Sequence, residues 1–140
     1  MKIKQLSVFV ENKTGRINEV AQILGRHGVN MTAFSLADNA DFGILRMIVS
    51  DVERAEKVLR EAHFGVSVTE VVCISCANVP GALSDVLDGL AKEQVFIEYM
   101  YAFSEGETAR VVIRPTDLDR CIEILQRCSC HLMSRNSLSQ

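Results

Sequence analysis

The sequence has few of the residues that mark membrane spans, disulfide frameworks or rigid turns. Its 140 residues include no Trp, two prolines and 6% aromatic residues. No apolar run approaches the ~18 residues of a membrane-spanning helix, and the N-terminal segment turns polar too early for a signal peptide. The five cysteines, an odd number, favour reduced thiols over a disulfide framework. These features predict a cytoplasmic protein that does not enter a membrane.

Charge of either sign is not concentrated anywhere in the chain. Fifteen basic and eighteen acidic residues give a net charge of -3, and they are interspersed along the sequence. A surface for nucleic acid or for anionic lipid would need a basic cluster. The 48% of hydrophobic and 24% of charged residues are typical of a globular protein. The composition therefore predicts a globular protein with no nucleic-acid partner.

The sequence repeats itself with a period of 66 residues. Asn12 falls on Asn78 and Gly15 on Gly81, and the apolar pattern agrees without a gap. Further matching pairs are Val20 and Val86, Leu24 and Leu90, Val29 and Val95, Asp51 and Asp117, Arg54 and Arg120, and Leu59 and Leu125. Such a fixed period indicates a duplication. We predict two domains, residues 1–70 and 71–140.

Each repeat is predicted to fold as β-α-β-β-α-β. First strands alternate near Leu6 and Val72, and strands are also expected over 29–37, 43–49 and 64–70, and over 95–103, 109–114 and 130–135. Apolar stripes predict two helices in each repeat. In the first repeat the stripes are Ile17, Val20, Ala21 and Leu24 for one helix, and Val52, Ala55, Leu59 and Ala62 for the other. In the second repeat they are Leu83, Val86, Leu87 and Leu90, and Leu118, Cys121, Leu125 and Cys128. Asp51 and either Thr116 or Asp117 are candidate N-caps. Gly28 is a candidate left-handed C-cap, and Gln94 at the matching position is less suited to that conformation.

This order of elements is typical of the ferredoxin-like α+β fold. Two helices cover one face of an antiparallel sheet, and the second strand lies at its edge. The other face is expected to be apolar, with Phe9, Phe34, Leu36, Ile44 and Ile48 in the first repeat and Phe96, Met100 and Val112 in the second. Either this face packs on a sheet of another chain, or the predicted strand register is wrong.

The turn before the first helix of each repeat has unusual chemistry. In the stretch 78–83, Pro80 restricts its own φ, and Gly81 allows a backbone conformation that other residues tolerate poorly. A helix that starts there presents unpaired N–H groups that attract carboxylates. The Asn78 side chain can both donate and accept hydrogen bonds. The first repeat has a related turn with Asn12 and Gly15.

The turn, the topology and the duplication together resemble the ACT domain. The resemblance rests on Asn-x-Pro-Gly-x-Leu after a strand, on the helix that follows, and on Val29-Asn30 at the start of a second strand, and it covers about residues 2–135. It implies two tandem ACT-like units whose sheets pair side by side into one eight-stranded sheet with four helices on one face. It also implies binding of an amino acid between two domains rather than catalysis.

Two ligand-binding sites follow from the resemblance. One is expected to join Asn78, Val79, Pro80, Gly81, Ala82 and Leu83 to Asn30 and Met31; the other is expected to join Asn12, Lys13, Thr14, Gly15, Arg16 and Ile17 to Phe96 and Ile97. The first site fits the family pattern better, because Phe96 replaces the Asn in the second. Lys13 and Arg16 either bind a ligand carboxylate there or are solvated surface charges.

Metal, redox and catalytic functions fit the sequence less well. Cys73 and Cys76 have C-x-x-C spacing, but on one strand they face opposite sides. Cys76, Cys121 and Cys128 align with small or apolar residues of the other repeat, as buried thiols would. No arrangement of nucleophile and base is evident. We expect no metal, no cofactor and no catalytic residue.

The sequence therefore predicts a non-enzymatic, homodimeric regulatory protein that senses a free amino acid. A metabolic enzyme is a candidate partner. The alternative is an interaction module that docks on an enzyme or transporter without a ligand of its own. The two interpretations differ in whether the turns bind a small molecule.

Overall fold

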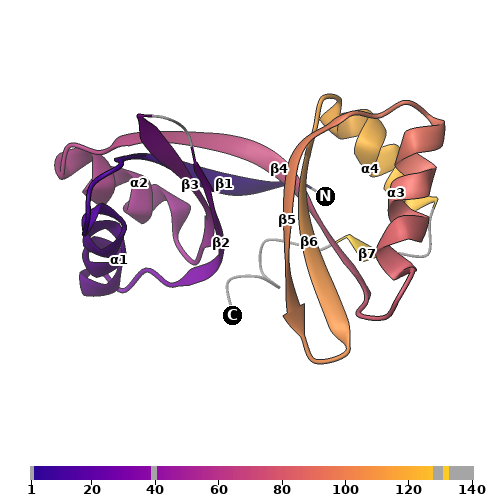
Figure 1. Cartoon of the computed structure of the whole chain (residues 1–140), viewed down its shortest axis with the longest axis horizontal. Coiled ribbons are helices and arrows are strands. Elements are labelled where there is room, and N and C mark those ends of the chain that lie inside the picture. The colour runs from indigo at the N-terminus through magenta and orange to yellow at the C-terminus, as the bar shows by residue number, and fades with distance from the viewer. Residues whose placement is uncertain (1, 39–40, 128–130, 133–140) are drawn as a thin grey trace. The chain divides into compact units, whose positions relative to one another are not determined.

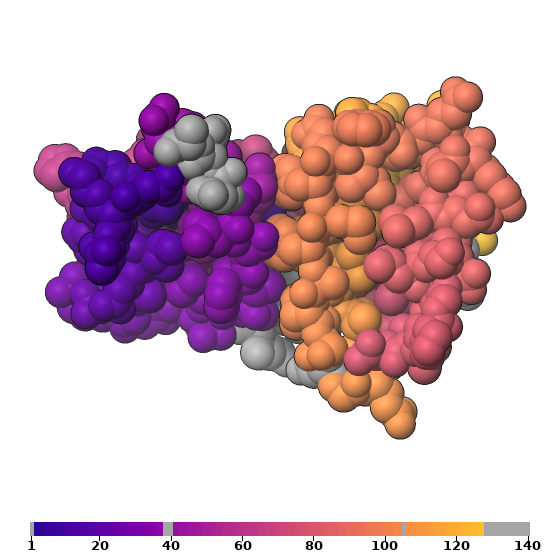
Figure 2. Space-filling view, in the orientation of Figure 1, coloured from indigo at the N-terminus to yellow at the C-terminus, as the bar shows by residue number. Residues whose placement is uncertain are grey.

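The computed structural model describes residues 2–38, 41–127 and 131–132. They divide into two units. The N-terminal unit is Lys4–Thr69; the C-terminal unit takes in Lys2 and Ile3 and the described residues from Glu70 onwards. In the space-filling view, the indigo-to-purple residues of the N-terminal unit form a continuous mass, and so do the orange residues of the C-terminal unit (Figure 2).

The N-terminal unit has the predicted order of elements. It comprises β1 (Lys2–Glu11) from Lys4 onwards, α1 (Arg16–Arg26), β2 (Met31–Asp38), β3 (Phe42–Val49), α2 (Val52–Glu61) and the first part of β4 (Gly65–Ala77). β3 pairs antiparallel with both β1 and β2. Both helices cover one face of this sheet (Figure 1). Their apolar residues meet Leu6, Val8 and Val10 of β1 in the core of the unit.

The C-terminal unit repeats this arrangement. The rest of β4 is followed by α3 (Ala82–Lys92), β5 (Ile97–Glu105), β6 (Thr108–Pro115), α4 (Leu118–Gln126) and β7 (His131–Leu132). β6 pairs antiparallel with β4 and β5, and β7 pairs with β4. Its core is built around Ile74, Leu90 and Leu125.

The predicted eight-stranded sheet is not found among the described strands. Their order is β2-β3-β1-β4-β6-β5, so β2 and β5 end the order and do not pair with each other. The physical reason is the lack of a linker: the 13-residue β4 is continuous and serves both units. Its Val66 lies in the N-terminal core, whereas its Val72 lies in the C-terminal core.

The helix boundaries agree with the predicted caps and only in part with the predicted stripes. Asp51 and Asp117 cap α2 and α4: each carboxylate accepts a hydrogen bond from the backbone N–H three residues on, at 3.1 Å. Gly28 and Gln94 both have positive φ, of 71° and 59°. In α1 the buried residues are Val20, Ile23 and Leu24. The predicted stripe is thus confirmed at Val20 and Leu24 and wrong at Ile17 and Ala21, which are exposed. The predicted Cys128 lies outside the described residues.

The faces of the second strands correct a further prediction. Phe34 and Leu36 pair with Met47 and Leu45, which are core residues, so they lie on the helix-covered side and not on the opposite face. Met100 likewise packs against the C-terminal core. A bulge near the start of each second strand shifts the register, and a shift of one residue exchanges the faces. Phe9, Ile44, Ile48 and Val112 do lie on the face away from the helices. Ile48 and Val112 are already buried in the single chain, whereas Phe9 is exposed; packing of that face on another chain stays a prediction.

Candidate ligand-binding turns

The turns before α1 and α3 share one backbone conformation. Gly15 has φ 90° and Gly81 has φ 87°, which are left-handed values that suit glycine. Neither residue offers a side-chain acceptor to the first N–H groups of its helix. In contrast, α2 and α4 are capped by aspartate. The Arg16 N–H donates to the Lys13 carbonyl and the Ala82 N–H to the Val79 carbonyl, each at 3.3 Å. The next two N–H groups of each helix can therefore be offered to a ligand.

A pocket lies beside the turn of the N-terminal unit. Its volume is about 300 Å³. It is lined by the end of β1, the turn, the start of α1 and the strands opposite: Val10, Glu11, Asn12, Lys13, Thr14, Ile17, Leu36, Ala37 and Gly43. Four of these were predicted site residues, namely Asn12, Lys13, Thr14 and Ile17. The predicted Gly15 and Arg16 do not line it.

The walls of the pocket are apolar. Ile17, in the first turn of α1, is 41% exposed. Leu36 is 50% exposed, although it lies on the helix-covered side of the sheet. Gly43 lies beside Leu36: a Cβ atom placed on Gly43 would be 3.2 Å from Leu36 Cδ1. The Leu36 side chain therefore occupies space that a larger residue at position 43 would contest. Leu36 and Gly43 were missed from the sequence because strand pairing, not chain proximity, brings them to the turn.

The rim of the pocket carries one charge of each sign. Lys13 Nζ lies 3.0 Å from Glu11 Oε2. This hydrogen bond, the charge of Lys13 and the charge of Arg16 lower the pKa of the Glu11 carboxyl from its ordinary value. Glu11 is thus ionised at neutral pH, and the two lining charges sum to zero.

Arg16 lies next to this pair but points elsewhere. Its guanidinium contacts Glu19 Oε2 at 2.8 Å and stands 4.8 Å from the centre of the Phe64 ring. Its distance to Glu11 Oε1 is 3.9 Å. Stacking on an aromatic ring and pairing with Glu19 tie Arg16 to the unit itself. It supports Glu11 electrostatically and does not face the pocket.

The turn of the C-terminal unit is built differently. The Asn78 N–H donates to the Glu107 carbonyl at 2.7 Å, and Asn78 Nδ2 lies 3.5 Å from the Gly106 carbonyl oxygen. Leu83 packs against the core, while Val79 and Pro80 are exposed. Asn78 thus ties the turn to the β5–β6 connection, a contact that sequence reasoning did not foresee.

Sixty-six residues after the pocket positions, the lining chemistry changes. Glu11 and Lys13 correspond to Ala77 and Val79, so the charge pair is absent from the second turn. Leu36 and Gly43 correspond to Ala102 and Ala109. The two turns share a backbone conformation, but the side chains at their matching positions differ.

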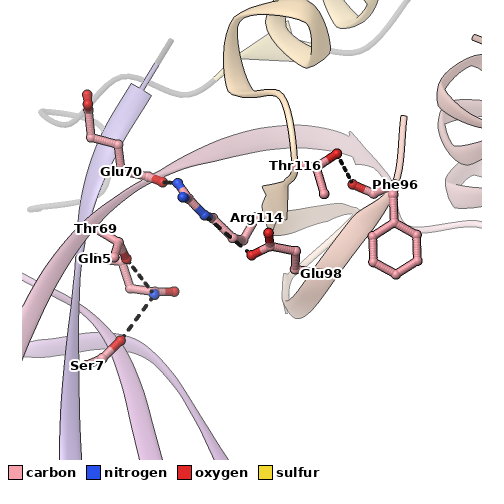
Figure 3. Close-up of polar contacts among 8 residues, drawn as sticks. All are labelled: Gln5, Ser7, Thr69, Glu70, Phe96, Glu98, Arg114 and Thr116. Atoms are coloured by element: carbon pink, nitrogen blue, oxygen red, sulfur yellow. Dashed lines mark hydrogen bonds and ion pairs between the residues drawn. The ribbon is translucent and has the colours of Figure 1, made fainter. Parts of the chain in front are cut away.

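The partner residues that the resemblance implies lie at the starts of the second strands. The Asn30 N–H donates to Ser50 Oγ at 2.9 Å, and Met31 packs against the N-terminal core. The Phe96 carbonyl accepts from the Thr116 N–H at 3.0 Å and from Thr116 Oγ1 at 3.4 Å, while its ring points away from Thr116 and is 67% exposed (Figure 3). Ile97 packs against the C-terminal core. Joining of these residues to the turns remains a prediction.

Other polar groups near the strands are committed to structure. Arg114 donates to the Glu70 carbonyl at 2.6 Å and lies 3.8 Å from Glu98 Oε2 (Figure 3). The buried Gln5 side chain donates to Thr69 Oγ1 at 3.3 Å, and its distance to Ser7 Oγ is 3.4 Å. These contacts are within single units and hold strands together.

The thiols lie in positions unsuited to joint metal or redox chemistry. Cys73 and Cys76 lie on opposite faces of β4, as predicted: Cys76 packs against the C-terminal core, and Cys73 pairs with Val112 on the other face. Burial raises the pKa of the Cys73 thiol to about 11, which keeps it protonated at neutral pH. Across the described part of the chain, no group of three metal-ligating side chains is present.

The architecture is that of a duplicated α+β protein made of two ferredoxin-like units. The family model for the ACT domain pair matches residues 1–140, and the chain belongs to this family. No curated protein matches the chain. No helix among the described residues is long and apolar enough to cross a membrane.

Solved structures share this architecture. A crystal structure of a protein from Bacteroides thetaiotaomicron is 51% identical, with a TM-score of 0.96, over 100% of this chain and 97% of that one. The regulatory subunit of aspartate kinase from Thermus thermophilus, in ligand-free form, is 14% identical, with a TM-score of 0.66, over 89% and 91%. The corresponding subunit from Thermus flavus is 12% identical, with a TM-score of 0.64, over 91% and 94%. The two Thermus structures agree with this chain in fold.

Proposed function

We propose that this chain is a regulatory protein that senses a free amino acid. The observation that carries the proposal is the pocket of about 300 Å³ beside a helix start that has no side-chain cap. Membership of the ACT domain pair family and the fold shared with regulatory subunits of aspartate kinase support it. The chain acts by binding, without catalysis of its own.

The chemistry of the turn suits the two charged groups of an amino acid. Uncapped N–H groups and the positive end of the helix dipole favour a carboxylate. Ionised Glu11 favours an ammonium group, and its Lys13 partner retains further N–H donors. A pocket of this volume lies at the lower end of the range for small-molecule sites. A free amino acid meets both conditions.

Regulation follows if the ligand orders the turn and the adjoining edge of the sheet. β2 is an edge strand and contributes Leu36 to the pocket, so a ligand held there changes the surface that this edge offers to a partner. A homodimer and a metabolic enzyme as partner are part of the proposal. The resemblance predicts two composite sites, each joining one turn to the second strand of the other repeat; of these, the site at the N-terminal turn is part of the proposal.

The second candidate function is an interaction module without a ligand. The observation that favours it is the exposed apolar surface of β2, where Phe34 is 62% exposed. Edge strands with apolar side chains are common docking sites for other chains. Such a module has no need of a pocket with paired charges.

Thermal unfolding of the reduced protein with each of the twenty amino acids tests the proposal. A ligand at 100 times its Kd adds about 2.7 kcal/mol to the free energy of unfolding. For a chain of this length, the midpoint should rise by about 5–10 °C. A selective rise with one chemical class supports a sensor. A flat response to all twenty contradicts it and favours the docking module.

A further inference from the structure

The N-terminal turn pocket has a lining that selects among amino acids. Five of its nine lining residues are aliphatic or glycine: Val10, Ile17, Leu36, Ala37 and Gly43. Its only ionisable residues are Glu11 and Lys13. A ligand with a charged side chain would place that charge against apolar walls and desolvate it without a partner. A zwitterion with an aliphatic side chain would not.

We infer that this pocket, and not the matching turn of the C-terminal unit, is a binding site for an aliphatic α-amino acid of the size of valine, leucine or isoleucine. The inference rests on the proposed function and deepens it by naming the ligand class and the unit that binds. The α-ammonium group is held by Glu11, and the α-carboxylate by Lys13 and the N–H groups of Ile17 and Asn18, which follow the Arg16 N–H that donates to the Lys13 carbonyl. The side chain lies between Ile17 and Leu36.

The internal ion pair leaves capacity for such a ligand. Lys13 uses one of its three N–H donors on Glu11 Oε2. Glu11 Oε1 lies 3.9 Å from Arg16, beyond hydrogen-bond distance. The ammonium group of a ligand can therefore take a place at Glu11 without breaking the Glu11–Lys13 contact.

The size of the pocket also limits the ligand. Its volume of about 300 Å³ is roughly ten times the ~30 Å³ that one water molecule occupies in the liquid. This volume accepts a small aliphatic zwitterion and part of its hydration. The absence of a Cβ at Gly43 lets Leu36 lie where it forms one wall.

The C-terminal turn lacks both parts of this recognition. Ala77 and Val79 stand where the charge pair stands in the first repeat, and Ala102 stands in place of Leu36. At these two positions it offers no charged side chain to the ammonium and carboxylate groups of a zwitterion. The inference thus assigns zwitterion binding to the turn that the family pattern matches less well.

Isothermal titration of the full-length protein with leucine tests the inference. In Glu11→Gln and Lys13→Met, loss of one charged partner should weaken leucine binding by about tenfold or more. Leu36→Ala should weaken it by about tenfold through lost apolar contact. Lysine and aspartate should bind the original protein at least about tenfold more weakly than leucine.

Two variants serve as matched controls. Phe34→Ala changes an exposed apolar residue on the same face of the same strand, outside the pocket. Val79→Ala changes the position that corresponds to Lys13 in the other turn. Both should bind leucine within about twofold of the original protein. Unchanged unfolding midpoints without ligand show that the variants are folded.

Three other results are possible, and they contradict the location of the site, the class of ligand or the proposed function. Leucine binding that weakens in Val79→Ala but not in Glu11→Gln places the site at the C-terminal turn and overturns this inference, while the proposed function stands. Tighter binding of lysine or aspartate overturns the ligand class alone. A chain that binds none of the twenty amino acids contradicts both the inference and the proposed function.

Discussion

The two β–α turns of this protein have nearly the same backbone conformation but different side chains on their surfaces. The glycines at the helix starts differ by 3° in φ, from 90° to 87°. Yet Glu11 and Lys13 line the first turn, and Ala77 and Val79 stand in the second. The backbone of such a turn is a requirement of the fold, whereas its side chains decide what it binds. The shared fold of the two turns therefore does not determine what each of them binds.

The cores of the two units should respond alike to the same change. Leu24→Ala in α1 and Leu90→Ala in α3 each truncate a fully buried side chain at matching positions. Each should lower the free energy of unfolding by about 2–5 kcal/mol, measured by denaturant titration. Leu36→Ala, at a half-exposed position, is the control and should cost much less. A large difference between Leu24→Ala and Leu90→Ala would contradict equivalent packing in the two cores.

The turn glycines should also be equivalent. Gly15→Ala and Gly81→Ala add a Cβ that meets no atom within 4 Å, so the cost is that of the left-handed backbone alone. Each should lower the free energy of unfolding by about 1–2 kcal/mol. Asparagine, which tolerates this conformation better, should cost less at both positions. If alanine were neutral at either position, the left-handed conformation there would be in doubt.

The aspartate caps provide a third comparison. Asp51→Ala and Asp117→Ala each remove one hydrogen bond of 3.1 Å to a helix N–H. Denaturant midpoints should report a loss of about 1 kcal/mol for each variant. Asp51→Asn and Asp117→Asn retain an acceptor, so each should lower the free energy of unfolding by only about 0.3 kcal/mol. Equal losses for alanine and asparagine would show that charge, not capping, is what matters.

The smallest expected effect concerns pH, and it should separate the turns. The pKa of Glu11 lies below its ordinary value, so the stabilising contact with Lys13 is complete at neutral pH and is lost as the pH falls through that lowered pKa. Leucine affinity should therefore be constant from about pH 5 to pH 8 and fall in stronger acid. Glu11→Gln should remove the acid limb in a titration series. An acid limb that persists in Glu11→Gln would assign it to another group.

Periodicity and cap residues were enough to predict the order of elements. Asp51 and Asp117 were recognised as caps because their signals are local in sequence. The faces of Phe34 and Leu36 were not, because a bulge after Met31 shifts the register and leaves no trace in an alternating pattern. In α1, Ile17 was predicted to be buried, whereas Ile23 is the buried residue. Both are apolar, and only the packing of the helix on the sheet decides which of them is buried.

The candidate site was predictable only where it is local. Asn12, Lys13, Thr14 and Ile17 follow from the turn itself. Leu36 and Gly43 reach the pocket through pairing of β3 with β2 and β1, which joins distant parts of the chain. Of the charge pair, Lys13 was a predicted site residue, whereas Glu11, which also lines the pocket, was missed. Non-local pairing, rather than residue type, limited the prediction.

The central claim is that the N-terminal turn, and not the C-terminal one, binds an aliphatic amino acid. Two-dimensional amide NMR of the full-length, isotope-labelled protein titrated with leucine tests it directly, because each turn reports separately. We expect saturable shifts for residues 10–17, 36–37 and 43, with residues 76–83 unchanged. Saturable shifts centred on 76–83, or none in either turn, would contradict it.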